Sequence, residues 1–391
     1  MNVAIVHDAF VQSRGGERVA LELVAAFDGA PLFTAAFRPE RLPRSLRPED
    51  IGTSFVQPLV RSGVPMPVLA PLLPAAFARI DVGQAELVVS SSSAFAHHVR
   101  VPAGAAHVCY CHTPPRFLWD AEDYFRGQAP RRALTRAGRA VFRQIDRAAS
   151  RRVDLYVANS RHTAARIRSV YGREALVVYP PVDVARFQPS TERSGRFVVV
   201  ARLRNQKRIE VAIQAANLAR LPLDVIGDGP ERERLERLAG STVRILGRRD
   251  DDEVRAAMAR SAGILVPAVA DFGLTLVEAQ ASGRPPIAFA AGGALEIVRD
   301  GLTGFLFEEQ TPEALARTMR RALEVDLGPA PLLESARRFD LASFRAGVRG
   351  AAELALERRL ARDPRRPTPA AAPALHFPTP FAGWQEPRHG G

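Results

Sequence analysis

Lysine is almost absent from this chain. Of its 391 residues, 54 are lysine or arginine, and Lys207 is the single lysine among them. An ammonium group is a compact point charge that the planar guanidinium of arginine does not reproduce. Lys207 is therefore either an accident of composition or a residue that a binding or catalytic site requires.

Cysteine is also scarce, with only Cys109 and Cys111 in the chain. The two alternate along a strand-like stretch, so their side chains point to one side and cannot form a disulfide of good geometry. A reduced, cytoplasmic protein is therefore expected. His107 and His112 flank the pair, but alternate positions of one strand do not supply the four converging ligands of a zinc site. We therefore predict no metal here.

Long apolar runs are missing too. The longest, residues 64–78, has 15 residues and contains four prolines, so it cannot form a membrane-spanning helix. It either packs inside the protein or forms a surface that meets lipid or a lipid-linked substrate. The N-terminal segment has no signal-peptide pattern, which agrees with a cytoplasmic location, in solution or on the inner face of the plasma membrane.

Positive charge, in contrast, is abundant, and the formal net charge is +12. A nucleic-acid-binding or scaffold protein is one alternative, since clustered arginines can neutralise phosphates. Most of the arginines are scattered, and we predict no nucleic-acid partner. One group recurs every three or four residues and would share a helix face, which is either solvated or docked on anionic lipid head groups. It consists of Arg132, Arg136, Arg139, Arg143, Arg147 and Arg151.

Short β-branched runs alternate with helical patterns, which indicates βαβ units on parallel sheets. The first series is "NVAIVHD", "PLFTAAF", "ELVVSSS", "HVCYCHT", "DLYVANS" and "ALVVYPP". The second is "RFVVVAR", "LPLDVIGDG", "TVRILG", "GILVPA", "PPIAFAAGG" and "GFLFEE". A polar stretch typical of a hinge lies between the two series. The predicted fold is α/β, with two doubly wound Rossmann-like domains facing across a cleft. We expect the domains at residues 1–185 and 196–361, a hinge at 186–195, and a flexible Pro- and Ala-rich tail at 362–391.

Glycines and charges gather in the loops where such sheets bind ligands, at the carboxyl ends of the strands. Gly15 and Gly16 precede a helix, where backbone amides can approach an anion closely. In the second half, Arg202 ends a strand and Lys207 lies near the opening of the next helix. A guanidinium fork and a point charge aimed at one place could clamp a diphosphate.

Taken together, these segments resemble family 4 glycosyltransferases, which are retaining, nucleotide-sugar-dependent enzymes with the GT-B fold. The resemblance covers residues 1 to about 355 and rests on motifs in combination: "RGGER", "YCHTPPRFLWD", "VANSRHTAARI", "VYPPVDVARF", "ARLRNQKRI", "DFGLTLVEAQASGRP" and "GGALEIVRDGLTGFLF". The stretch "CHTPPRFLWD" is most similar to mannosyltransferase-type members that build bacterial surface polysaccharides.

The resemblance implies a role for each matching position. Arg202 and Lys207 would hold the donor diphosphate and neutralise the leaving group. His112 would lie against the transferred sugar, and Glu278 would bind the ribose hydroxyls. The remaining donor-binding positions that it implies are loop residues: Gly15, Gly16, Gly247, Arg248, Phe272, Gly273 and Leu274.

One position departs from the family pattern. The first carboxylate of the family's glutamate pair, eight residues before Glu278, is Ala270 here. Asp271 beside it is a candidate replacement in donor binding. Since a lost positioning contact commonly reduces the rate by a large factor, an inactive or donor-altered descendant is an alternative to an active transferase.

The resemblance also implies the partners. The donor, GDP-mannose or a UDP-sugar, is a substrate, and neither a cofactor nor a metal is expected. The acceptor would be a saccharide or a polyprenyl-linked saccharide, with an anionic membrane surface as a further candidate partner. The acidic run 250–252 resembles a metal-binding motif of other glycosyltransferases, but it precedes a predicted helix and is better explained by N-capping. Epimerases and phosphorylases of the same fold are rivals, although a phosphorylase would need a cofactor-binding lysine besides Lys207.

Overall fold

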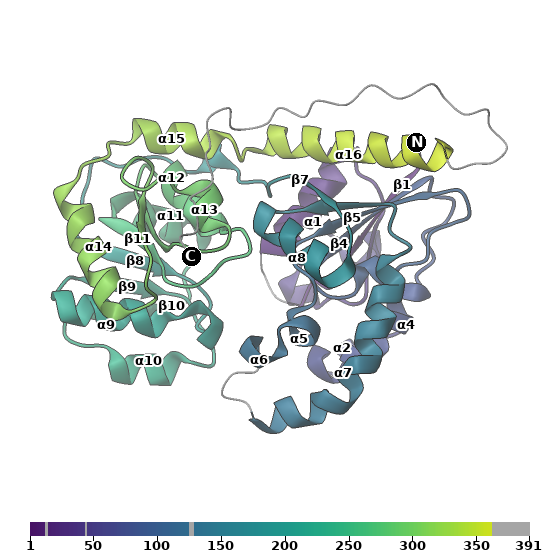
Figure 1. Cartoon of the computed structure of the whole chain (residues 1–391), viewed down its shortest axis with the longest axis horizontal. Coiled ribbons are helices and arrows are strands. Elements are labelled where there is room, and N and C mark those ends of the chain that lie inside the picture. Colours follow the sequence, from purple (N-terminus) through teal and green to yellow (C-terminus); the bar gives the residue numbers. More distant parts are fainter. Residues whose placement is uncertain (12–14, 44, 125–128, 362–391) are drawn as a thin grey trace, which may run out of the picture.

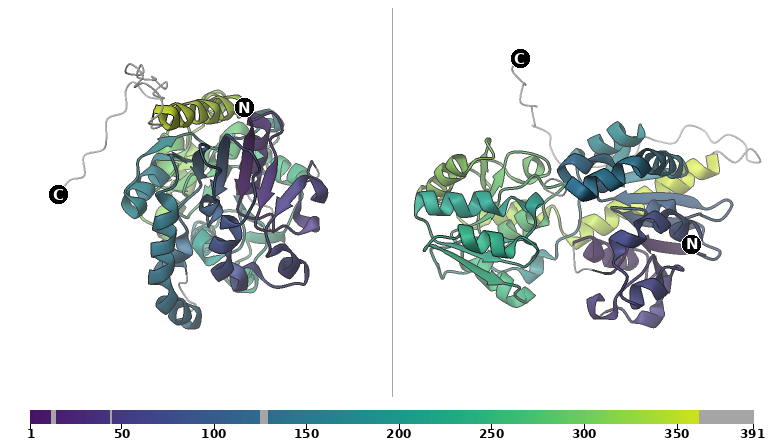
Figure 2. Two further views of the ribbon diagram at one scale, coloured as in Figure 1. Left: turned by 90° about the vertical axis from the view of Figure 1, so that its right-hand side faces the viewer. Right: turned by 90° about the horizontal axis from the view of Figure 1, so that it is seen from below.

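The structure is a computed structural model that describes residues 1–11, 15–43, 45–124 and 129–361 (Figure 1). It contains two parallel sheets flanked by helices, and the two resulting bodies lie side by side (Figures 1 and 2). The predicted α/β fold with two doubly wound domains is confirmed. The predicted tail, residues 362–391, lies outside the described residues.

The first sheet has seven parallel strands in the order β3-β2-β1-β4-β5-β6-β7. All six strands that the sequence predicts for this half are present, and β3 is additional. It is a three-residue edge strand, too short for a hydrophobic period to show. The strands are β1 (Val3–His7), β2 (Leu32–Thr34), β3 (Ile51–Thr53), β4 (Leu87–Ser92), β5 (Ala106–Cys111), β6 (Leu155–Ala158) and β7 (Ala175–Val177).

The second sheet has six parallel strands in the order β10-β9-β8-β11-β12-β13, and all six are predicted. Their buried, β-branched runs account for this, because a parallel sheet covered on both faces has few polar positions. The strands are β8 (Phe197–Val200), β9 (Leu223–Ile226), β10 (Val243–Gly247), β11 (Gly263–Val266), β12 (Pro286–Phe289) and β13 (Phe305–Phe307).

Helices connect the strands in both halves. Those of the first half are α1 (Gly15–Ala26), α2 (Gln57–Arg61), α3 (Met66–Leu69), α4 (Leu73–Ala78), α5 (Arg116–Trp119), α6 (Ala121–Tyr124), α7 (Ala129–Ser150) and α8 (Arg161–Tyr171). Those of the second are α9 (Ile209–Ala219), α10 (Arg232–Leu238), α11 (Asp251–Arg260), α12 (Leu274–Ala281), α13 (Ala294–Ile297), α14 (Pro312–Glu324) and α15 (Ala330–Arg337). In the part of the chain that the structure describes, no helix is long and apolar enough to cross a bilayer.

The last described helix, α16 (Leu341–Ala361), packs on the first domain rather than the second (Figure 1). Phe344, Val348 and Ala351 lie in the same core cluster as Ile5 of β1. Residues 341–361 therefore belong by packing to the first domain, which differs from the expected range of 196–361. Sequence order hides this, because the apolar stripe of a helix does not reveal which sheet it covers.

The chain consequently crosses between the domains twice, and the two crossings lie together. The backbone N–H of Val182 in the first crossing donates to the carbonyl of Phe339 in the second at 2.8 Å. Arg284, only 3% exposed, donates to the carbonyls of Ala259 and Ser190 at 2.6 Å each. These bonds attach the expected hinge segment to the second domain.

Candidate functional site

The strand order of each sheet reverses at its centre. β1 lies between β2 and β4, and β8 lies between β9 and β11. At such a switch point the connections leave toward opposite faces of the sheet, and the crevice between them binds ligands. The loops after β1 and β8, which carry the predicted glycine pair and the single lysine, begin at these two points.

The glycine pair opens α1 at the boundary between the domains. A Cβ added at Gly15 would lie 2.4 Å from Cδ1 of Leu274 in the second domain, so the start of α1 lies directly against the start of α12. A Cβ at Gly16 would lie 3.6 Å from His7 and 3.7 Å from Nε2 of His112. The structure thus brings together three predicted elements of the site: the glycine loop, the histidine, and the start of α12.

His112 is held in the first domain by its neighbours. Its Nε2 lies 2.8 Å from Oγ of Ser91, and Nδ1 of His7 lies 3.1 Å from the same hydroxyl. The side chain of Asn159 donates to the carbonyl of His112 at 2.9 Å. Burial, followed by the charge of His7, lowers the pKa of His112 to about 4. The imidazole is therefore neutral at neutral pH, which suits contact with an uncharged sugar.

The single lysine lies in the loop after β8, as predicted, but outside the helix that follows. It ends a short 3₁₀ turn, Asn205–Lys207, and α9 begins two residues later. Arg202 and Lys207 are both exposed. The amide of Gln206 donates to the carbonyl of Tyr124 in the first domain at 3.0 Å, so this turn faces the cleft.

Two glycines that were not predicted support this loop. A Cβ at Gly227 would lie 1.9 Å from the carbonyl oxygen of Ala201, and one at Gly229 would lie 2.3 Å from that of Leu203. The loop after β9 therefore packs directly against the backbone on both sides of Arg202. The stretch "GDGP" at the end of a predicted strand was the available signal.

The loop after β11 is shaped by its phenylalanine. Phe272 is 3% exposed, and its ring centroid lies 5.6 Å from that of Tyr179 and 5.4 Å from that of Phe339. Its side chain is part of the packing, so only its backbone is available to a ligand. Gly273 follows as the N-cap of α12 with φ of 110°, a conformation that favours glycine.

The carboxylate of Asp271, next to Ala270, is directed at side chains of the first domain. It lies 3.4 Å from the hydroxyl of Thr113, which donates to it, and 3.9 Å from the guanidinium of Arg116. Both partners belong to the first domain. The hydroxyl of Ser160 also donates to the backbone carbonyl of Asp271 at 2.5 Å. Asp271 therefore holds the two domains together in this structure.

Glu278 in α12 is paired across the domain boundary. Its side chain is 15% exposed, and Arg18 of α1 donates to it at 3.1 Å. The same guanidinium lies 3.4 Å from the carboxylate of Asp251. Burial raises the pKa of Glu278, whereas Arg18 acts in the opposite direction. Arg18 was not predicted as a site residue, although it belongs to the quoted "RGGER" motif.

Glu296 is a second carboxylate whose contacts the sequence did not predict. It accepts hydrogen bonds from the backbone N–H groups of Arg161 and His162 at 2.9 and 3.1 Å, and from the hydroxyl of Tyr179 at 3.1 Å. A helix of the second domain thus supplies a negative charge to the N-terminus of α8 in the first, where the helix dipole favours it.

Gly247, Arg248 and the acidic run 250–252 lie at and after the end of β10. Gly247 has φ of 71°, and its carbonyl accepts from the N–H of Gly227 at 2.8 Å, while Arg248 is exposed. Asp250 caps α11 through a reciprocal capping box with Glu253, with bonds of 2.8 and 3.1 Å. The predicted N-capping by the acidic run is confirmed.

The predicted basic helix differs from expectation. The guanidinium groups of Arg143 and Arg147 lie over the ring of Trp119, 5.2 and 4.8 Å from its centroid. Val141 and Ile145 of the same helix are 56% and 41% exposed. α7 therefore presents apolar side chains to solvent and uses part of its basic face for packing. The side chains of Arg132 and Arg136 lie outside the described residues.

The arrangement as a whole can bind an anionic, hydroxyl-rich molecule between the domains. It offers basic side chains and glycine-rich backbone at two switch points, a neutral imidazole, and a buried carboxylate. The cysteines are free and buried. Within the described ranges, the side chains that converge as metal ligands are His97, His98 and Asp146 rather than the cysteine pair and its flanking histidines.

Two family models match the chain. Residues 13–186 match the model described as Glycosyltransferase Family 4, and residues 183–340 match the one described as Glycosyl transferases group 1. A D-inositol 3-phosphate glycosyltransferase of Salinispora arenicola is 31% identical over 225 residues, which are 47% of this chain and 50% of that protein. The chain spans about half the length of the curated relatives it matches.

Solved structures resemble the chain over most of its length. The sucrose-phosphate synthase of Thermosynechococcus elongatus has a TM-score of 0.70 and 19% identity, over 90% of this chain and 99% of that one. The Anabaena protein HepE, in complex with UDP-glucose, has a TM-score of 0.67 and 19% identity, over 90% and 99% of the two chains. These similarities show that the two-domain arrangement is the GT-B fold.

Proposed function

We propose that the protein, whose two halves match the family 4 and group 1 glycosyltransferase models and together have the GT-B fold, is a family 4 glycosyltransferase. It transfers a sugar from a nucleotide diphosphate donor to a saccharide acceptor with the anomeric configuration retained. The observation that carries the proposal is the meeting of the glycine loop, His112 and the start of α12 at the cleft. The UDP-glucose bound by HepE supports a nucleotide-sugar donor.

Charge stabilisation of the leaving group accounts for the chemistry. Arg202 and Lys207 neutralise the diphosphate as its bond to the sugar breaks, together with amide groups at the start of α1. The acceptor hydroxyl attacks from the same face, and its proton passes to the departing phosphate. Glu278 binds the ribose after Arg18 releases it, so donor binding exchanges one contact of this carboxylate for another.

Mannose is the transferred sugar that we favour, with GDP-mannose as donor and cell-surface polysaccharide synthesis as the setting, on the strength of the "CHTPPRFLWD" stretch. Ala270 makes a changed donor the main competitor. A thermal-shift screen with GDP-mannose, UDP-glucose, UDP-galactose and UDP-N-acetylglucosamine tests this choice. A shift with GDP-mannose alone supports it, a shift with one UDP-sugar replaces the donor, and no shift with any of the four contradicts the proposed function.

Transfer is proposed to need no divalent metal, because Arg202 and Lys207 would supply the positive charge that a metal ion supplies in metal-dependent transferases. Activity that EDTA abolishes and manganese restores would overturn this. Retention itself is tested by NMR of the product anomer, and steep salt-dependent binding to duplex DNA without nucleotide-sugar binding would favour the nucleic-acid alternative.

A membrane surface is proposed as the place of action, with a polyprenyl-linked saccharide as acceptor. Ile145 of α7, which is 41% exposed, lines a groove of about 400 Å³ between α4 and α7 together with Arg100 and Arg152, and Val141 of the same helix is 56% exposed. Apolar side chains next to positive charge fit the boundary of an anionic bilayer. Phe55, Leu59, Val68 and Leu72 of the same domain are exposed as well.

Sedimentation with vesicles tests the membrane proposal. Binding to vesicles rich in phosphatidylglycerol, with none to pure phosphatidylcholine, is the expected result. Ile145→Glu should reduce the bound fraction severalfold, whereas Leu218→Glu, which changes a 53% exposed leucine of the second domain, should not. Equal loss in the two variants, or no binding by the wild type, would contradict the proposal.

A further inference from the structure

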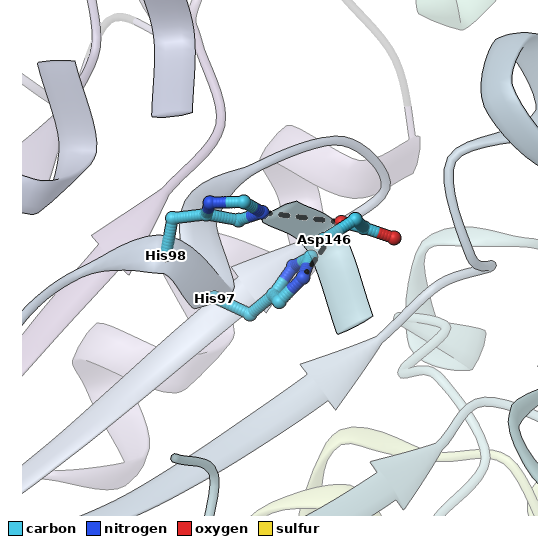
Figure 3. A group of neighbouring side chains, drawn as sticks. All are labelled: His97, His98 and Asp146. Carbon is cyan, nitrogen blue, oxygen red and sulfur yellow. Dashed lines mark hydrogen bonds and ion pairs between the residues drawn. The ribbon is translucent and has the colours of Figure 1, made fainter. Parts of the chain in front are cut away.

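Three metal-ligating side chains converge inside the first domain, on the side of the sheet that α7 covers (Figure 3). His97 and His98 come from a 3₁₀ turn, Ala96–His98, that follows β4, and Asp146 comes from α7. The side chains of the histidines are 3% exposed and that of Asp146 is fully buried. Burying a carboxylate is costly unless it is paired, so this group needs a specific explanation.

The ligand atoms of the three side chains all lie within 4.8 Å of one another. Nε2 of His97 and Nε2 of His98 lie 3.0 and 3.1 Å from the same oxygen, Oδ1 of Asp146. Zinc bonds to imidazole nitrogen and carboxylate oxygen are roughly 2.0–2.2 Å long, so the ligand atoms of a tetrahedral ion are about 3.3–3.5 Å apart. Small side-chain movements would therefore suffice to admit an ion between them.

The atoms of Asp146 and His97 that point away from the centre of the group make hydrogen bonds with other side chains. Oδ2 of Asp146 accepts hydrogen bonds from the indole of Trp119 and the hydroxyl of Tyr171, both at 2.8 Å. Nδ1 of His97 lies 3.1 Å from the hydroxyl of Ser92. Metal ligands are oriented by such second contacts, which leave one oxygen and one nitrogen to face the ion.

Hydrogen bonding alone leaves one atom of the group unsatisfied. Nε2 of His98 makes a hydrogen bond to Asp146, but the buried Nε2 of His97 makes none of good geometry despite its closeness to the carboxylate. Buried ring nitrogens usually make a well-formed hydrogen bond, whereas this one shares Oδ1 of Asp146 with His98. A coordinated ion would provide that partner.

The group is also within reach of solvent. His98 lines the groove between α4 and α7, beside Phe142 and Ile145. An ion can enter by this path, and a water molecule from the groove can complete the coordination. Two imidazoles and one carboxylate are donors that suit zinc and its neighbours rather than magnesium or calcium.

We propose that His97, His98 and Asp146 bind one divalent ion of the zinc type, which fastens α7 to the turn after β4. The contacts described for these side chains are all within the first domain, so the ion has a structural role and takes no part in sugar transfer. Its loss is expected to lower stability, because a metal that binds only the folded state stabilises it.

Metal analysis of the full chain tests the site. The protein is stripped with a chelator, reloaded with zinc and dialysed, and the bound metal is then measured by mass spectrometry. About one zinc per chain is expected, with a melting temperature several degrees above that of the stripped protein. Cobalt loading should give the visible absorption of a coordinated ion.

Asp146→Asn and His98→Gln provide the variants, with His162→Gln as the matched loss of a histidine outside the group. The asparagine keeps an oxygen for Trp119 and Tyr171 but is a poor ligand. Each of the first two variants should lose at least tenfold in zinc affinity, while His162→Gln keeps the wild-type value. Zinc-free wild type that neither binds the ion nor gains stability from it overturns the proposal, as does unchanged zinc affinity in both variants.

Discussion

At the residue scale, Lys207 is unusual both in composition and in its position in the structure. The only lysine of the chain ends the turn that leaves the switch point of the second sheet. We predict that Lys207→Arg lowers kcat/KM for transfer at least tenfold, about 1.4 kcal/mol, because the larger planar group cannot place its charge on the same point. Steady-state kinetics at saturating acceptor measure the effect.

Arg237→Lys is the matched control for that variant. Arg237 is an exposed residue of α10, and its exchange should leave the rate unchanged. Both variants should melt at the wild-type temperature, since surface substitutions of this kind have small effects on stability. A wild-type rate in Lys207→Arg would indicate that this single lysine is an accident of composition and that transfer does not require it.

The lowered pKa values of two buried histidines lead us to expect that the stability of the fold depends on pH. Burial lowers the pKa of His107 to about 3, and burial and then the charge of His7 lower that of His112 to about 4. The unfolded chain takes up these protons near pH 6.5, whereas the folded chain does not. Stability should therefore be full above pH 6.5 and fall as the pH drops toward 4.

The expected loss between pH 7 and pH 5 is on the order of 2 kcal/mol for each histidine. Urea unfolding at the two pH values measures it. Asp8 opposes the shift at His112, so that contribution is the smaller one. His112→Asn should flatten the pH dependence, and an equally steep curve in this variant would contradict the assignment.

At the scale of elements, α16 shows that chain position and domain membership differ. Phe344 is 1% exposed and its ring centroid lies 5.6 Å from that of Tyr110 on β5. Arg345 donates to Glu22 of α1 at 2.6 and 2.9 Å. The helix thus closes the first domain from the far end of the described chain.

Phe344→Ala is therefore predicted to destabilise the first domain by about 3–5 kcal/mol, the usual result of emptying a buried aromatic site. Leu360→Ala on the same helix, where the side chain is 47% exposed, should cost far less. Hydrogen exchange of β1 and β5 locates the effect. Faster exchange confined to strands of the second domain would show that the helix belongs there instead.

At the scale of the whole molecule, carboxylates of the second domain hold the cleft closed. Glu278 binds Arg18, the backbone and carboxylate of Asp271 bind Ser160 and Thr113, and Glu296 binds the first turn of α8. These are the same loops that would enclose a donor. Closure and donor binding therefore share residues, as in enzymes that complete their site by domain movement.

Glu296→Gln should shift the molecule toward an open form. The amide carries no charge for the two N–H groups of α8, and charge-assisted bonds are worth about 1.5–3 kcal/mol each. We expect a larger radius of gyration by small-angle scattering and weaker donor binding. Glu324→Gln, an exposed change on α14, is the control, and equal radii in the two variants would contradict the prediction.

The sequence by itself determined the strands, the two-domain architecture and the loops that carry the site. These depend on short stretches: buried β-branched runs, glycines at strand ends, and charged residues that follow them. Twelve of the thirteen strands were predicted for that reason, and β3 was missed because three residues hold no period. The positions of Gly15 at the start of α1 and of His112 directly after β5 follow from the same local signals.

Only the tertiary structure decided which of these groups meet. Arg18 and Glu278 are 260 residues apart, Arg161 and Glu296 are 135 apart, and His98 and Asp146 are 48 apart. The outward-facing apolar residues of α7 and the return of α16 to the first domain were equally hidden. Local sequence patterns specify which face of a helix or strand is apolar. They do not specify its partner, because the hydrophobic effect is non-directional and stabilises contact with any complementary apolar surface. The packing of the whole chain therefore determines which surfaces meet.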